Sequence, residues 1–212
     1  MTGLRVGLES GRKKVFASAL DWPGWCRSAR TEEAALEALA SCRERYFEAL
    51  GETAPAETES PDVVERVEGN GTTDFGAPAI AFECEAAPMR SEESEHQLAL
   101  LEGLWRYFDE VAATSPAVLR KGPRGGGRDR DPMVLHVLNA EVEYGRKVGC
   151  ERWKPESASR DEIKARRTAL LERLRLVAGP EPHEVKWPPA YAIRRTAWHV
   201  LDHAWEMEDR AL

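Results

Sequence analysis

Apolar side chains recur at helical spacing through residues 92–113, and this pattern constrains the fold more than any other feature. A helix of this length buries such a face only by packing against other elements. The pattern therefore predicts that the second half of the chain is built from packed helices. The residues on this face are Leu98, Leu101, Leu104, Trp105, Phe108 and Val111.

Three further long helices are predicted over residues 131–149, 159–179 and 188–212. Two of their starts carry capping signals. Asp131 is followed by proline at the first helical position, and Ser159 is followed three residues later by glutamate. Four helices of roughly 18 to 24 residues, joined by loops of moderate length, are typical of an up-down four-helix bundle.

The first part of the chain has a different pattern, that of a small α+β unit. Residues 4–8 and 14–20 read as two strands of a hairpin, and residues 62–68 as a third strand. Between them, Thr31 is a natural N-cap for a helix that runs to about Leu50 and ends at a glycine. We therefore expect strands early in the chain and helices later.

These patterns predict an α+β protein with two domains. Residues 1–71 form the small α+β unit and residues 92–212 form the helical bundle. Residues 72–91 are interpreted as the connecting segment, because glycine and proline interrupt any regular pattern there. One more strand is expected near residues 79–83.

Charge and cysteine usage exclude several classes of protein. The net charge is −7, so neither half is a basic nucleic-acid-binding unit. No stretch approaches the roughly 20 apolar residues of a membrane span, and no secretory signal is seen, so we expect a cytoplasmic protein. The cysteines are scattered without a Cys-x-x-Cys pair, which indicates reduced thiols rather than a disulfide framework. They are Cys26, Cys42, Cys84 and Cys150.

Histidines provide the candidate functional site. His199 and His203 are four residues apart, so a helix places both imidazoles on one face, where they can chelate one metal ion. His136 is the best candidate for a third ligand. Two interpretations remain open: the polar row that carries the pair either is buried and needs partners such as a metal ion, or is exposed and needs none.

At this point the second half resembles the DinB-like metal-binding four-helix bundles, which include the mycothiol-dependent enzymes. The resemblance rests on the sequence around His136 in residues 134–141 and on the His-x-x-x-His motif in residues 199–204. It covers residues 92–212. It implies one divalent ion held by His136, His199 and His203, for which we expect zinc or nickel. Many of the proteins that it resembles form dimers, so a homodimer is a further expectation.

The first half is similar to the small HicB-like α/β fold. The similarity rests on residues 16–25 and on the helix start at residues 31–34. HicB antitoxins join such a unit to a DNA-binding segment, but a helical bundle follows here. We therefore interpret this unit as an accessory domain that packs on the bundle or mediates contacts between copies.

A basic, glycine-rich loop spans residues 120–131. Its arginines Arg124, Arg128 and Arg130 are candidate substrate-binding residues, because guanidinium groups suit carboxylates and phosphates. The alternative is a solvated loop without a ligand. The loop lacks the Gly-Lys-Ser/Thr ending of a phosphate-binding P-loop.

Two functions are consistent with these features. The first is a metal-dependent enzyme, and the resemblance implies a transferase or isomerase that uses a low-molecular-weight thiol. Its substrate would be a small thiol or an anionic molecule. The second is a non-catalytic binding protein in which the histidines hold a structural ion or form a polar core, and in which the N-terminal unit recruits a partner. The sequence identifies no catalytic residue for either.

Overall fold

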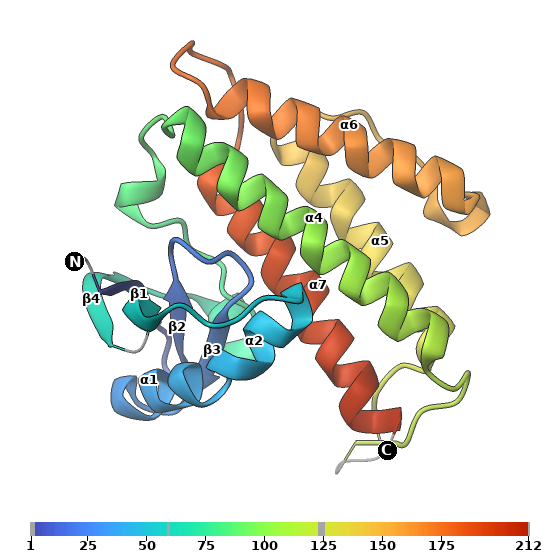
Figure 1. The fold of residues 1–212 in the computed structure, drawn as a ribbon, viewed down its shortest axis with the longest axis horizontal. Coiled ribbons are helices and arrows are strands. Elements are labelled where there is room, and N and C mark those ends of the chain that lie inside the picture. Colours follow the sequence, from blue (N-terminus) through green and yellow to red (C-terminus); the bar gives the residue numbers. More distant parts are fainter. Residues whose placement is uncertain (1–2, 59, 123–125, 212) are drawn as a thin grey trace.

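The computed structural model describes residues 3–58, 60–122 and 126–211 (Figure 1). A four-stranded mixed sheet comes first along the chain and helices follow, which confirms the expected α+β class. The strands are β1 (Leu4–Ser10), β2 (Val15–Ala19), β3 (Cys26–Ala29) and β4 (Pro61–Glu68). The helices are α1 (Glu32–Ser41), α2 (Arg43–Leu50), α3 (Gly71–Phe75), α4 (Ser91–Thr114), α5 (Arg130–Lys147), α6 (Arg160–Ala178) and α7 (Pro189–Ala211), with short 3-10 turns η1 (Ala56–Thr58), η2 (Glu83–Glu85) and η3 (Pro155–Ser157).

The strand order in the sheet is β3-β2-β1-β4. The hairpin of β1 and β2 and the later strand β4 confirm three predicted strands, and β4 pairs in parallel with β1. The sequence analysis missed β3, a four-residue strand in which only Cys26 is fully buried. The strand expected at residues 79–83 is wrong. The backbone N–H groups of Ala79 and Ile80 donate to the buried Glu9 carboxylate instead of to a neighbouring strand.

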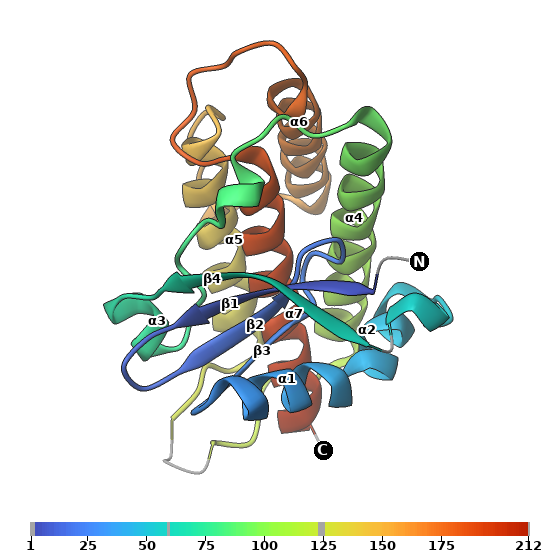
Figure 2. The same cartoon turned by 90° about the vertical axis from the view of Figure 1, so that its left-hand side faces the viewer.

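Both faces of the sheet are covered (Figure 2), which explains why every residue of β2 is buried. Successive side chains of a strand point to opposite faces. Ala17 packs with the apolar residues of α1, which contacts β2 and β3. On the other face, the Phe16 ring meets the Trp198 ring of α7 edge to face at 6.1 Å.

The helix expected over residues 31–50 forms as two helices, α1 and α2, that break at Cys42. Its predicted ends are confirmed. The Thr31 hydroxyl accepts a hydrogen bond from the Ala34 N–H at 3.2 Å, and Gly51 ends α2 in the left-handed conformation. The α5 helix begins slightly earlier than expected, with Asp129 rather than Asp131 at the N-cap position.

The α7 helix lies at the centre of the helical part, in contact with α4, α5 and α6 (Figure 1). Every residue from Tyr191 to Leu201 is buried, including its polar residues. A helix buried on all sides must satisfy its polar groups within the protein. The open question about the histidine row is thereby answered at His199, which is only 7% exposed.

One hydrophobic cluster joins the sheet to the long helices, from Leu4 in β1 to Met207 in α7. The two parts approach closely at the turn before β3. Gly24 has φ +98°, and a Cβ there would lie 2.6 Å from Leu104 of α4 and 3.4 Å from the Ala197 backbone of α7. Among the described residues, no helix combines the length and apolar character that a membrane crossing requires.

Candidate metal centre

Three histidines from two helices meet in the structure. His136 lies on α5, and His199 and His203 lie one turn apart on α7. Each offers one ring nitrogen, and these nitrogens all lie within 4.8 Å of one another. The structure therefore brings together the three histidines that the sequence pattern indicated, although His136 precedes His199 by 63 residues.

The distance between the ring nitrogens of His136 and His199 suits two ligands of one ion. The Nε2 atoms of His136 and His199 are 3.2 Å apart. Two ligands of a tetrahedral zinc ion, each at about 2.0–2.1 Å from it, are separated by about 3.3 Å. The same distance suits a direct hydrogen bond between two neutral imidazoles. The geometry is thus consistent with both a metal centre and a polar histidine cluster.

The surroundings keep two of the imidazoles neutral. Burial, helped by the charges of Arg128 and His203, lowers the pKa of His136 to about 4. Burial is also the main cause that lowers the pKa of His199, followed by the charges of His203 and Arg195. A neutral imidazole offers the lone pair that a metal ion needs.

Glu206 orients His203 from the next turn of α7. Its Oε2 lies 3.0 Å from Nδ1 of His203, and its Oε1 accepts a hydrogen bond from Arg210 at 2.8 Å. The bond to His203 is the main cause that lowers the pKa of Glu206. A carboxylate on Nδ1 fixes the tautomer and leaves Nε2 free as a ligand, which is the usual arrangement at metal-binding histidines.

His199 lacks such a partner. Its Nδ1 atom is buried without a hydrogen bond to any residue that the structure describes. A buried ring nitrogen without a hydrogen-bond partner costs free energy, so this atom destabilises the folded protein.

Two residues that the sequence analysis did not select also lie at the histidine cluster. The Tyr144 ring of α5 meets the His199 ring at 5.8 Å, nearly at right angles. The Arg195 guanidinium lies over the Tyr144 ring, 5.1 Å from its centroid. Spacing in the sequence could have indicated Arg195. It stands four residues before His199, so it lies on the same helix face as the two histidines, one turn nearer the helix N-terminus.

The three arginines of the basic loop differ in their surroundings. Arg124 lies outside the described residues. Arg128 is exposed, and its charge acts on His136 and His199. Arg130 is already engaged, because it donates to Asp131 at 2.7 Å and to the Ser115 carbonyl at 3.0 Å. Of the two described arginines, Arg128 is therefore the better candidate for binding a substrate.

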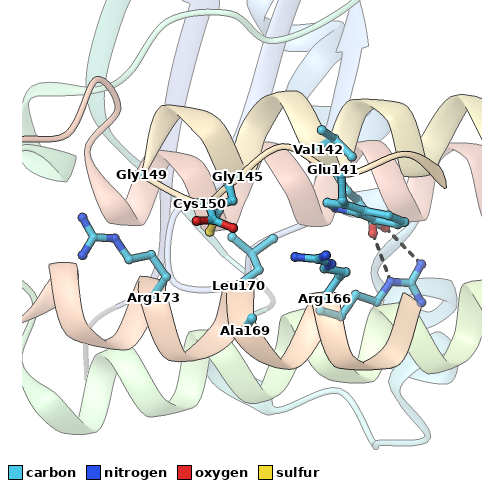
Figure 3. Close-up of a pocket in the computed structure, with 12 residues that line it drawn as sticks. Glu141, Val142, Gly145, Gly149, Cys150, Arg166, Ala169, Leu170 and Arg173 are labelled. Atoms are coloured by element: carbon cyan, nitrogen blue, oxygen red, sulfur yellow. Dashed lines mark hydrogen bonds and ion pairs between the residues drawn. The ribbon is translucent and has the colours of Figure 1, made fainter. Parts of the chain in front are cut away.

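A cavity of about 240 Å³ lies elsewhere, between α5 and α6 (Figure 3), and none of the three histidines lines it. At one end of the cavity the buried Glu141 accepts hydrogen bonds from Trp105 and Arg167. Arg167 also binds Asp109. Glu141, Arg167 and Asp109 are thus paired with one another, which indicates a structural role in holding α4, α5 and α6 together.

Comparison of the chain with protein-family models, with curated proteins and with solved structures found no match. The chemistry of the site must therefore be argued from its own residues.

Proposed function

We propose that this protein is a divalent-metal-dependent enzyme whose ion is held by His136, His199 and His203. The observation that carries the proposal is the convergence of three ring nitrogens within 4.8 Å, two of them on neutral, buried or half-buried imidazoles. Three neutral protein ligands leave coordination positions for a substrate, which distinguishes catalytic from structural sites. The ion would be zinc or nickel.

The protein's own residues would divide the work. The three histidines would bind the ion, and Glu206 would hold His203 in its ligand tautomer. A divalent ion lowers the pKa of a bound thiol, which makes a thiolate available at neutral pH. Tyr144 and the burial of α7 would limit the access of water to His199.

The fold supports the same proposal. The long helices α4, α5 and α6 all contact the buried α7, and this packing supports a DinB-like four-helix bundle. Such a bundle would act as a transferase or isomerase that uses a low-molecular-weight thiol. The sheet and α1 would form an accessory, HicB-like unit fastened to α7, with the protein working in the cytoplasm.

Elemental analysis of untagged protein tests the proposal. We expect about one divalent ion per chain in the wild type and none in a His199→Ala, His203→Ala double variant. A His96→Ala, His183→Ala double variant is the matched control and should keep the ion, because neither residue belongs to the cluster. Wild-type protein that contains no ion and cannot be loaded with one would refute the proposal.

The second candidate function is a non-catalytic binding protein. It is favoured by the 3.2 Å contact between His136 and His199, which two imidazoles can make by direct hydrogen bonding without a metal ion. Under this alternative the histidines stabilise the packing of α5 against α7, and the N-terminal unit recruits a partner.

A further inference from the structure

Arg195 is a buried cation without a counter-charge. It is 8% exposed, and its Nη1 atom is buried without a hydrogen bond. Among the residues that the structure describes, it forms neither an ion pair nor a side-chain hydrogen bond. An unpaired buried charge is costly, so proteins usually pair such groups or keep them for a ligand.

The neighbouring residue Arg194, on the same helix, is paired with a buried carboxylate. It is 2% exposed, and its guanidinium binds the buried Glu85 carboxylate with two hydrogen bonds of 2.6 and 2.9 Å. It also donates to the Ile80 carbonyl at 3.0 Å. Two consecutive arginines of α7 are therefore both buried, but only Arg194 is paired with a carboxylate.

Aromatic rings hold the Arg195 guanidinium. Its central carbon lies 4.6 Å from the centroid of the Trp198 ring and 5.1 Å from that of Tyr144. Cation–π contacts of this kind recover part of the cost of removing the guanidinium from water. They use the π faces of the rings and leave the N–H donors, which lie in the guanidinium plane, available to an oxyanion.

The position of Arg195 links it to the histidine cluster. It precedes His199 by one turn on the same face of α7. The Tyr144 ring contacts both the Arg195 guanidinium and the His199 ring. Arg195 differs from the exposed Arg128, whose charge also acts on the cluster, in being buried without a counter-charge. Its single charge matches one negative charge on a ligand.

We propose that Arg195 binds the carboxylate of a small acidic ligand whose second donor atom, a thiol, reaches the His136, His199 and His203 cluster. The proposal rests on the proposed function for the thiol end of the ligand. The carboxylate end depends on Arg195 and does not require the metal ion. A guanidinium binds a carboxylate through two parallel hydrogen bonds, which gives direction as well as charge.

The carboxylate end can be tested without a metal ion. Propionate is titrated into metal-free wild-type protein, and the side-chain Nε–H resonances of the arginines are followed by nuclear magnetic resonance. We expect a saturable shift at Arg195 and none at the paired Arg194, with 1-propanol as the neutral control. An unchanged Arg195 resonance would overturn the proposal, and this measurement requires no variant that could misfold.

The complete site can be tested in cobalt-loaded protein, in which thiol binding is read from the thiolate-to-cobalt absorption band. The probes are 3-mercaptopropionate and 1-propanethiol, which differ in the carboxylate. We expect wild type to bind the acid at least about tenfold more tightly than the neutral thiol. Arg195→Met should reduce this ratio to about one. Arg173→Met, on α6, should keep it.

The outcomes separate the two proposals. Protein that takes up no cobalt refutes the metal-dependent function, and the propionate titration then still decides the role of Arg195. Protein that binds both thiols with an equal ratio in wild type and Arg195→Met refutes the carboxylate site and leaves the metal site standing.

Discussion

The Nε2 atoms of His136 and His199 lie 3.2 Å apart although 63 residues separate them in the chain. The contact joins α5 to the buried central helix α7, and His203 adds a third nitrogen from the next turn. Burial at this contact lowers the pKa of His136 and His199 and so keeps both imidazoles neutral. A neutral imidazole has a free lone pair with which it can bind a metal ion. Four predictions follow from this arrangement and from the packing around it.

Removing the Glu206 carboxylate should weaken metal binding without removing a ligand. Glu206→Ala frees Nδ1 of His203, so the ring loses its fixed tautomer and orientation. We expect the affinity for zinc to fall about 10- to 100-fold, measured by competition with a chelator. Glu208→Ala is the control, because Glu208 binds Arg45 and not the cluster. Equal affinities in both variants would contradict the role of Glu206.

Acid should destabilise the metal-free protein between about pH 6.5 and about pH 4. The pKa of His136 is about 4 in the folded protein, against about 6.5 in the unfolded chain. Between these values the unfolded chain binds more protons, so the free energy of unfolding falls as the pH falls. The charged groups that face His136 are Arg128, His203 and Glu206.

Urea unfolding of metal-free protein at pH 7 and at pH 5 measures this effect. The midpoint should drop on going to pH 5, and it should drop less in His136→Asn, which has no imidazole to protonate. The same drop in both proteins would show that His136 is not responsible.

The neighbouring arginines of α7 should respond differently to the same substitution. Arg194→Met leaves the buried Glu85 carboxylate unpaired, so we expect a loss of about 3–5 kcal/mol in the free energy of unfolding. Arg195→Met removes an unpaired charge and its cation–π contacts, so the change should stay within about 1 kcal/mol. Chemical denaturation of the two variants compares them directly. A loss at Arg195 as large as that at Arg194 would indicate a purely structural role for both.

Gly24 should tolerate no side chain. Gly24→Ala places a Cβ 2.6 Å from Leu104 and also puts alanine at a positive φ, so we expect a cost of about 2–4 kcal/mol, the sum of both effects. Gly51→Ala is the matched control, because Gly51 also has a positive φ but its Cβ would meet open space. It should cost about 1 kcal/mol. Thermal unfolding of both variants measures the difference, and equal costs would show that contact with Leu104 is unimportant.

Local patterns predicted most of the elements correctly, because the forces that start and end them act within a few residues. Thr31 and Ser159 bind N–H groups three residues away, as expected of N-caps. The failures occurred where distant residues decide. Residues 79–83 have the apolar character of a strand, but the N–H groups of Ala79 and Ile80 donate to the Glu9 carboxylate. No local pattern predicts this contact, because Glu9 lies 70 residues earlier in the chain.

The class of fold and the three candidate ligands could be predicted from local patterns, because hydrophobic period and i,i+4 spacing are properties of single helices and strands. The tertiary structure alone decided which polar groups lose water. Complete burial of residues 191–201 in α7 removes the unpaired Arg195 from water and lowers the pKa of His199, and no local sequence pattern reveals either effect. Desolvation depends on every element that packs around a group, and those elements come from distant parts of the chain.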